Sequence, residues 1–442
     1  MTDEAFIDCT VGDLAAQTRN ALVGGPFGSD LISRDYVASG VPVIRGANLG
    51  HGRWVDGEFA YVTHEKAESL SSNCAKPGDI VFTQRGTLGQ VALVPNKGVD
   101  RYLISQSQMK LTVDADKADA MFLYYVFTST EQQDYIKQNA IQTGVPHTNL
   151  GILRNTPLTL PPLAEQKAIA TVLGALDDKI ELNRRMNATL EAMARALFQS
   201  WFVDFDPVRA KLDGRTPTGL APPTAALFPD HLEDSPLGHI PKGWHVGPIL
   251  RQADLLSGGT PKTDVPAYWN GDIPWASAKD VSQCGEAFLI STERTITRQG
   301  VEDSSTKIIP ELATVVVARG ATTGRLTIFG HAMAMNQTCY GLRSKVHAPF
   351  SLYCHARHFI ERLVQGGHGS IFDTITTSTF EATDVLLAPK EVLLAFDMQV
   401  TPLFEQVRAN LHQSRTLATL RDALLPKLLS GELSVTEAAS LA

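Results

Sequence analysis

The sequence predicts an α+β fold made of two copies of one unit, in which a β-rich domain precedes a long helix. A short β-rich run that ends in Arg-Gly occurs once in each half of the chain, at residues 78–87 and 312–321. Each half then enters a stretch whose apolar residues follow heptad spacing, which is typical of a coiled-coil helix. The chain has 442 residues, 43% of them hydrophobic, which is enough for two or three domains with their own cores.

The internal repeat is the most informative feature of the sequence. Its offset drifts by a few residues along the β-rich parts, as loop insertions would cause. The matched motifs, in chain order, are Gly24-Gly25-Pro26 with Gly258-Gly259-Thr260-Pro261, Val41-Pro42-Val43 with Asp272-Ile273-Pro274-Trp275, Arg85-Gly86 with Arg319-Gly320, and Ser105-Gln106-Ser107 with Asn336-Gln337-Thr338.

The two heptad stretches match without gaps, with every residue of one 227 positions from its counterpart, as Ile180 is from Val407. Alternating steps of three and four define a seam on each helix. The first seam contains Leu173, Leu176, Ile180, Asn183, Asn187, Leu190, Ala194, Leu197 and Trp201, and the second contains Val400, Leu403, Val407, Asn410, Ser414, Leu417, Arg421, Leu424 and Leu428.

Prolines set the expected helix ends. The first helix is predicted to start after Pro161-Pro162 and to run from Leu163 to about Trp201, a length of roughly 58 Å at about 1.5 Å per residue. Because Pro402 and Pro426 lie near the ends of the second stretch, its regular part is predicted to be shorter, from Thr401 to Leu425.

Polar residues interrupt both seams at the same two levels. Asn183 corresponds to Asn410, and Asn187 to Ser414. A buried polar seam residue costs stability but fixes helix register, so these four are candidates for setting the alignment. The alternative that they lie at a solvated helix edge stays open.

These features divide the chain into five parts. We predict a first β-rich domain at 1–160, the first long helix at 161–206, a linker at 207–240, a second domain at 241–389, and a C-terminal helix and tail at 390–442. The linker assignment rests on residues 213–223, which are rich in Pro, Gly and Thr.

Composition excludes several classes of protein. No stretch of about eighteen apolar residues is present and the N-terminus lacks a basic region, so we expect a cytoplasmic protein. The five cysteines are scattered without metal-site spacing, so no metal site is expected. The net charge of −8 argues mildly against nucleic acid as a partner, unless basic residues such as Lys262, Lys279, Arg319 and Arg325 gather on one face.

Three runs carry a resemblance to a known family. They are Pro161-Pro162-Leu163-Ala164-Glu165-Gln166-Lys167-Ala168-Ile169-Ala170, Leu197-Phe198-Gln199-Ser200-Trp201-Phe202-Val203-Asp204-Phe205-Asp206-Pro207 and Leu424-Leu425-Pro426-Lys427-Leu428-Leu429-Ser430-Gly431-Glu432-Leu433. The chain resembles the specificity subunits of type I restriction-modification systems over nearly its full length. The second helix departs from the pattern at its start, where Pro389-Lys390-Glu391-Val392-Leu393 replaces Pro162-Leu163-Ala164-Glu165-Gln166.

The resemblance implies two target-recognition domains joined by an antiparallel coiled coil that acts as a spacer. Each domain would read one half of a split, asymmetric site in double-stranded DNA, and an approximate two-fold axis would match that of the duplex. The implied partners are two methyltransferase subunits and the restriction subunits. S-adenosylmethionine is expected in the former, ATP and Mg in the latter, and no cofactor in this chain.

The sequence lacks the motifs of catalysis. It has no glycine-rich cofactor loop after a strand, no Asn or Asp-Pro-Pro-aromatic run, and no phosphate-binding loop. We therefore expect a non-enzymatic chain. A structural scaffold that binds no DNA is the alternative from another class, and a degenerate methyltransferase is a third.

Candidate DNA contacts are polar residues at strand ends and turns of the repeat, because side chains of these types bond base edges or phosphates. Arg85 and Arg319 have a second interpretation, in which they brace the turn or grip phosphate. The candidates are Arg45, Asn48, Gln84, Arg85, Thr87, Gln106, Thr143 and His147 in the first copy, and Lys262, Thr263, Ser277, Lys279, Arg319, Thr322, Thr323, Gln337, His368 and Ser370 in the second.

Overall fold

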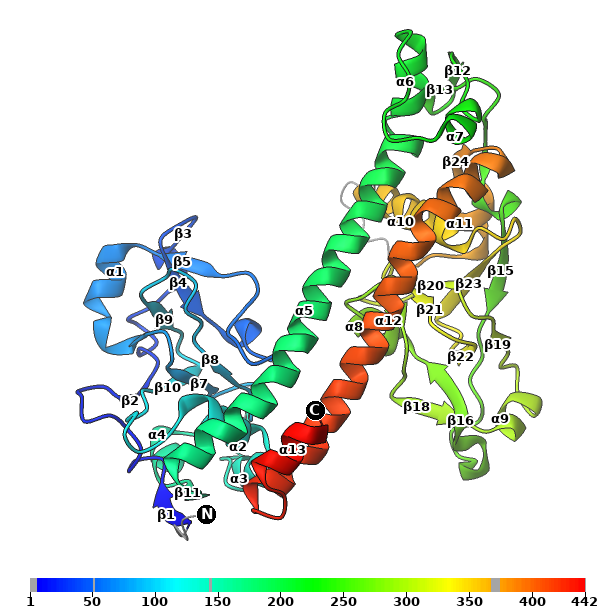
Figure 1. The fold of residues 1–442 in the computed structure, drawn as a ribbon. Coiled ribbons are helices and arrows are strands. Elements are labelled where there is room, and N and C mark those ends of the chain that lie inside the picture. The colour runs from blue at the N-terminus through cyan, green and yellow to red at the C-terminus, as the bar shows by residue number, and fades with distance from the viewer. Residues whose placement is uncertain (1–5, 51, 143–144, 367–373, 442) are drawn as a thin grey trace. The chain divides into compact units, whose positions relative to one another are not determined.

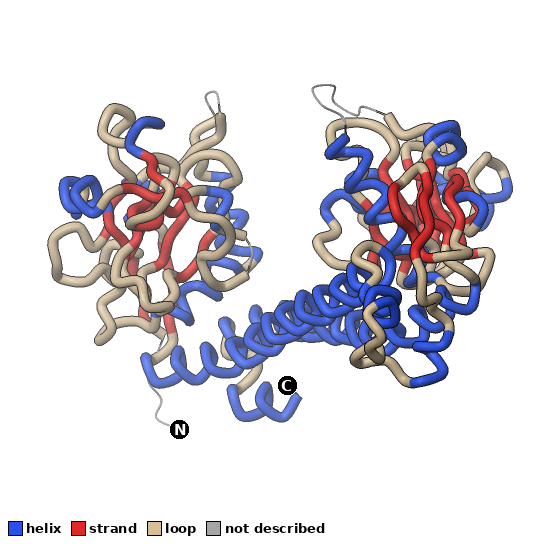
Figure 2. The backbone as a smooth tube through the Cα atoms, turned by 90° about the horizontal axis from the view of Figure 1, so that it is seen from above, coloured by secondary structure: helices blue, strands red, loops and turns tan. Residues whose placement is uncertain are grey.

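The computed structural model describes residues 6–50, 52–142, 145–366 and 374–441. These residues form two compact units, each of which contains one β-rich domain and part of both long helices. Unit 1 comprises residues up to Leu182 together with those from Ser414, and unit 2 comprises Asn183–Gln413. Figure 1 labels the elements, and Figure 2 shows that the strands of each unit lie together, with loops around them.

Unit 1 contains a four-stranded sheet in the order β2-β10-β7-β8, a five-stranded sheet β3-β5-β4-β9-β6, and the pair β1-β11. Its elements are β1 (Ile7–Thr10), β2 (Leu22–Gly24), β3 (Tyr36–Val37), β4 (Val41–Ile44), β5 (Ala60–Val62), α1 (His64–Ser69), β6 (Cys74–Ala75), β7 (Ile80–Thr83), β8 (Val91–Leu93), β9 (Tyr102–Ile104), β10 (Gln108–Leu111), α2 (Ala120–Thr128), α3 (Thr130–Gln138), α4 (Leu150–Arg154), β11 (Pro157–Leu160) and α13 (Val435–Leu441).

Unit 2 repeats this plan with a five-stranded sheet β15-β23-β20-β21-β17, a four-stranded sheet β18-β16-β22-β19, and the pair β14-β24. Its elements are α6 (Asp206–Leu212), α7 (Pro222–Ala226), β12 (Leu232–Ser235), β13 (Gly238–Pro241), β14 (His245–Pro248), β15 (Ala253–Ser257), β16 (Trp269–Ala276), α8 (Ala278–Gln283), β17 (Phe288–Leu289), β18 (Arg294–Ile296), α9 (Arg298–Glu302), β19 (Ile308–Ile309), β20 (Thr314–Val317), β21 (Leu326–Phe329), β22 (Met333–Met335), β23 (Cys339–Ser344), α10 (Pro349–Gly366), α11 (Thr377–Ala382) and β24 (Asp384–Leu387).

The α+β fold predicted from the repeat is confirmed, down to equivalent strand pairings. The strand before each Arg-Gly turn, β7 or β20, pairs antiparallel with β10 or β23. An equivalent parallel strand pair occurs in each unit, β4 with β9 in unit 1 and β16 with β22 in unit 2.

The long helices are α5 (Leu163–Phe202) and α12 (Lys390–Leu429), each 40 residues long, and they lie side by side (Figure 1). They run antiparallel, because Phe202 near the end of α5 contacts Phe396 near the start of α12, while Asn187 bonds Asn410 farther along. In unit 1 the same helices contribute Leu173 and Leu428 to one core.

The predicted bounds of the second helix are wrong. It begins at Lys390, directly after Pro389, and continues past both Pro402 and Pro426. A proline inside a helix costs about 3 kcal/mol. Four residues before Pro402 are at most 3% exposed, namely Val392, Leu393, Phe396 and Val400. Burying each stabilises the fold by about 1.5–3 kcal/mol, so packing outweighs the proline.

The segment with linker composition is partly folded. Residues 212–223 are mostly exposed, but the flanking residues form α6, α7 and the hairpin β12-β13. Phe228 is 2% exposed and packs edge-on against Trp201, with ring centres 5.1 Å apart. This segment therefore belongs to the core of unit 2. No helix within the described ranges is long and apolar enough to cross a membrane.

Candidate functional site

Strand register brings the predicted loops of unit 1 to one edge of its sheets. Gly24 at the end of β2 and Thr83 at the end of β7 lie beside the start of β10. Ile44 pairs with Ile104, so β4 and β9 end at the same edge. We call residues 25–31, 45–48, 84–90, 105–107 and 147 the first loop edge.

Unit 2 has an equivalent edge. Ser257 pairs with Tyr340 and Val317 with Cys339, so β15 and β20 both end beside the start of β23. Ala276 pairs with Met335, which brings the ends of β16 and β22 to the same place. We call residues 258–263, 277–279, 318–325 and 336–338 the second loop edge.

Glycines hold the loops of each edge close together. A Cβ on Gly25 would lie 1.9 Å from the Ser105 carbonyl oxygen, and one on Gly258 would lie 2.2 Å from that of Asn336. The glycine after each repeated arginine, Gly86 or Gly320, has a positive φ of 105° or 97°. The repeat therefore preserves glycine where only glycine fits without strain.

The repeated arginines occupy the same place in both units. Arg85 forms an isolated antiparallel bridge with His147, and Arg319 forms one with Thr374. Both arginine side chains are exposed. Neither makes a side-chain hydrogen bond or ion pair with the described residues. The interpretation that their side chains brace the turn is therefore not supported, which leaves both guanidinium groups able to bind a ligand.

Several other candidates form hydrogen bonds within the loop edges. Gln106 Nε2 donates to the carbonyls of Leu31 (2.8 Å) and Gly28 (3.1 Å). Thr260 Oγ1 donates to Gln337 Oε1 at 2.5 Å. These bonds tie neighbouring loops of each edge together, although both glutamines are exposed.

Asn48 and Ser277 are corrections to the predicted contacts. Asn48 is fully buried, and its amide bonds the Arg45 N–H (3.0 Å) and the Glu58 carbonyl (3.0 Å). The half-buried Ser277 caps α8 by accepting from the Asp280 N–H and donating to its carboxylate. Both residues shape the loops and have no free polar group for base contact. Their types suggested contact, but Ser277 is the N-cap of α8, a position that favours serine, and Asn48 closes a short 3-10 turn by accepting from the N–H of its N-cap residue, Arg45.

The remaining candidates differ in their side-chain bonds and in their exposure. Lys279 binds Glu293 at 2.7 Å, and this hydrogen bond raises the pKa of the lysine. Thr322 accepts from Ser282, and Thr323 donates to the Gly320 carbonyl. Arg45, Thr87, Lys262 and Thr263 are exposed, while Gln84 and His147 are half-buried. Thr143, His368 and Ser370 lie outside the described residues.

Two tryptophans position the loop that carries Lys262. Trp269 Nε1 donates to the Lys262 carbonyl at 3.1 Å, and Trp275 Nε1 donates to that of Gly259 at 3.0 Å. The Arg294 guanidinium lies 3.5 Å from the centre of the Trp269 ring. No sequence signal identifies these residues, because an exposed arginine over an indole has no sequence pattern.

The helix seam residues are all buried or half-buried. Asn183, Asn187 and Asn410 are at most 3% exposed. Asn410 Nδ2 donates to Asn187 Oδ1 at 2.8 Å, and Asn183 Nδ2 donates to the Asn410 carbonyl at 3.3 Å. Ser414 is half-buried. These bonds favour the register interpretation over the solvated-edge alternative for the three asparagines.

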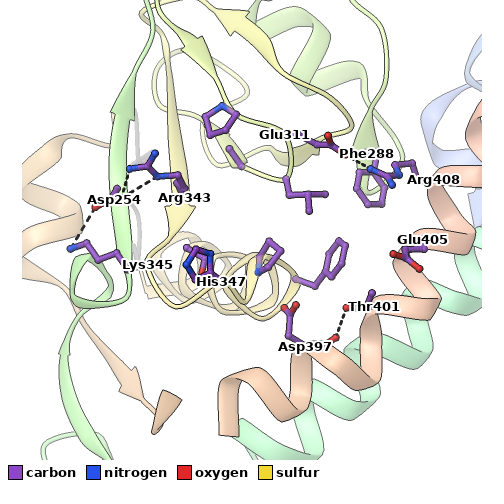
Figure 3. Close-up of a pocket in the computed structure, with 16 residues that line it drawn as sticks. Asp254, Phe288, Glu311, Arg343, Lys345, His347, Asp397, Thr401, Glu405 and Arg408 are labelled. Atoms are coloured by element: carbon purple, nitrogen blue, oxygen red, sulfur yellow. Dashed lines mark hydrogen bonds and ion pairs between the residues drawn. The ribbon is translucent and has the colours of Figure 1, made fainter. Parts of the chain in front are cut away.

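A cavity of about 730 Å³ in unit 2 contains charges that are mostly paired (Figure 3). Asp254 binds Arg343 at 2.7 Å, and Arg408 pairs with Glu311. Asp397 accepts from the Ser351 N–H at 2.8 Å. Burial raises the pKa of Asp397 to about 6, although this hydrogen bond lowers it.

The raised pKa predicts a pH-dependent stability. The folded chain keeps a proton on Asp397 that the unfolded chain releases above a pH of about 4, so stability is lost as pH rises from about 4 through 6. Asp397→Asn should remove this loss. Urea unfolding at pH 4.5 and pH 7 measures the free energy of unfolding of the variant and of the unaltered chain. If that free energy depends on pH identically in the two, Asp397 is not the group responsible.

No group of three or more His, Cys, Asp or Glu side chains suited to a metal ion occurs among the residues that the structure describes. Neither loop edge has paired carboxylates in a cavity. Both edges have exposed cationic and amide side chains on loops that are hydrogen-bonded to one another.

Comparison with known proteins gives a consistent result. The family model described as "Type I restriction modification DNA specificity domain" matches residues 35–192 and 241–393. The HindI specificity subunit of Haemophilus influenzae is 28% identical over 81% of this chain and 87% of its own length. The MjaIX specificity subunit of Methanocaldococcus jannaschii is 26% identical over 94% of this chain and 92% of its own length. The crystal structure of the S subunit from M. genitalium has the same fold, with a TM-score of 0.55, 15% identity and 97% coverage of both chains.

Proposed function

The chain belongs to the family of type I restriction-modification specificity subunits, and from this premise we propose that its two loop edges read the two halves of a bipartite DNA site. The observation that carries the proposal is the repeated edge itself. In each unit the same strand ends meet at one edge, and an exposed arginine follows the same strand there. Different side chains around this constant frame would give each half-site its own bases.

We further propose that the chain docks two methyltransferase subunits and the restriction subunits, and that all bond-making and bond-breaking takes place in those partners. S-adenosylmethionine would bind in the methyltransferase subunits, and ATP and Mg in the restriction subunits. Supporting this division, the relatives are named specificity subunits. Acting on the host's DNA would place the complex in the cytoplasm.

Long-read methylation mapping tests this proposal in a host that carries the operon. We expect one motif with two defined halves and an undefined gap, which disappears when this chain is deleted. A continuous palindrome, or a methylation pattern that does not depend on the chain, would contradict the proposal. Neighbouring genes for an adenine methyltransferase and a helicase-like nuclease would be the expected context.

The repeated arginines should bind phosphate, because a residue kept in both copies cannot account for half-sites that differ. Arg85→Ala and Arg319→Ala should each weaken DNA binding by the assembled complex. Each should reduce the slope of log affinity against log salt by about 0.9, since about one phosphate contact is lost. The methylated motif should stay the same.

Arg298→Ala is the matched control. Arg298 is exposed but pairs with Glu302 on α9, so its loss should leave the salt slope unchanged. Salt titrations of binding to a cognate duplex and to a scrambled duplex measure both effects. A change of motif in Arg85→Ala or Arg319→Ala would show base reading in place of phosphate contact.

A further inference from the structure

The aromatic run that spans the end of α5 and the residues before α6 lines a second cavity of unit 2, of about 630 Å³. Phe198, Phe202 and Phe205 come from this run, and Phe359 comes from α10. All four side chains are at most 8% exposed, so they form the floor of the cavity. An aromatic floor of this kind accepts a flat apolar group.

Two arginines line the same cavity without an acidic partner among the described residues. Arg209 Nε donates to the backbone carbonyl of Asp204 at 2.7 Å, and Arg362 is exposed and makes no described ion pair. The one carboxylate in the lining is Asp384, which lies more than ion-pair distance from both. The cavity therefore has uncompensated positive charge at its edge.

Three histidines also line the cavity, and one of them, His239, lies 3.2 Å from the carboxylate of Asp234. His355 Nδ1 donates to the Ser351 carbonyl at 2.8 Å, and burial lowers the pKa of this histidine to about 4, so it is neutral. Burial, and then the charge of Arg362, lower the pKa of His358. Arg362 thus lies near enough to His358 to affect it, and Glu361 raises the pKa of this histidine by less than Arg362 lowers it.

Unit 1 has a groove between α2 and α12 with the opposite character. Asp8, Glu131 and Asp422 line it, and its arginine, Arg421, already binds Asp177 at 2.6 Å. The uncompensated positive charge is therefore a property of unit 2 and does not follow from the repeat.

We propose that the cavity of unit 2 docks an acidic segment of a partner protein, with an aromatic side chain among the phenylalanines and the neighbouring carboxylate at Arg209 and Arg362. Charge complementarity selects an acidic partner, and the aromatic floor selects a segment with an adjacent aromatic residue. This interaction goes beyond DNA recognition and does not depend on it.

Isothermal titration of the full chain tests the proposal with two blocked tetrapeptides, glycine-phenylalanine-aspartate-glycine and the same peptide with asparagine for aspartate. We expect the acidic peptide to bind about tenfold more tightly, which is the usual effect of a charge-assisted hydrogen bond. Replacing both arginines, Arg209→Gln with Arg362→Gln, should abolish this difference while leaving the fold intact, because both side chains are exposed.

Arg298→Gln is the control, since it removes a paired arginine elsewhere in unit 2 and should keep the tenfold preference. Equal binding of both peptides, or a preference that survives the loss of both Arg209 and Arg362, would overturn the proposal. Displacement of the acidic peptide by a short DNA duplex of unrelated sequence would also overturn it, in favour of a nucleic-acid contact.

Discussion

Inserting one heptad into each long helix is expected to lengthen the gap between the two half-sites by about three base pairs. Seven helical residues add about 10 Å, and one base-pair step spans about 3.4 Å. A heptad also returns the seam to within about 20° of its original direction, so the helix pairing is preserved. The bases of both half-sites should stay unchanged.

The structure shows where to insert. The border between the units falls after Leu182 in α5 and after Gln413 in α12. Residues added at both points leave the contacts within each unit intact. Methylation mapping in the host measures the new spacing. Unchanged spacing would refute the role of the helices as a ruler, and a heptad in α5 alone, which mismatches the two helices, should abolish modification.

Removing the carboxylate of Asp177 is expected to destabilise the fold strongly, by about 3–5 kcal/mol. Its side chain is 10% exposed and binds Arg421 at 2.6 Å and the Tyr125 hydroxyl at 2.7 Å. Asp177→Ala would leave the buried Tyr125 hydroxyl without its acceptor, and it would leave the half-buried Arg421 with only the exposed Asp422 as its acidic partner. Burial and this carboxylate raise the pKa of Tyr125 far above its usual value.

Asp422→Ala is the matched control. Asp422 also binds Arg421, at 2.7 Å, but its side chain is 64% exposed, so its loss should cost less than about 1 kcal/mol. Urea unfolding measures both variants. In a double-mutant cycle, Asp177→Ala and Arg421→Ala should be strongly coupled, and additive effects would show that the network does not stabilise unit 1.

This network also extends to Arg53, which is 6% exposed, pairs with Asp178 and donates to the Gly174 carbonyl at 3.3 Å. The sequence offered one signal for it. Arg421 stands at a seam position, where a charge needs a partner. That partner lies 244 residues away in the chain, so no local pattern identifies it.

The sequence by itself determined the repeated α+β plan, the pairing of long helices and the strand ends that carry the polar loops. Periodicity and glycine placement are local properties, and they survive in both copies because each copy must form the same backbone. The start of α12 and its path through Pro402 were not predictable, since they depend on how much apolar surface the folded core buries.

The tertiary structure alone decided which polar residues are free. Asn48 and Arg85 were both candidates for DNA contact, yet Asn48 is buried within its loop and Arg85 is exposed. The tertiary structure also decided how the buried side chains of the two copies differ. Asp177 and Arg421 have Phe404 and Ala194 as their counterparts 227 residues away, both buried in an apolar core. The same backbone arrangement thus accommodates either an ion pair or apolar side chains at these positions. Which of the two occurs depends on complementary side chains that meet only after folding.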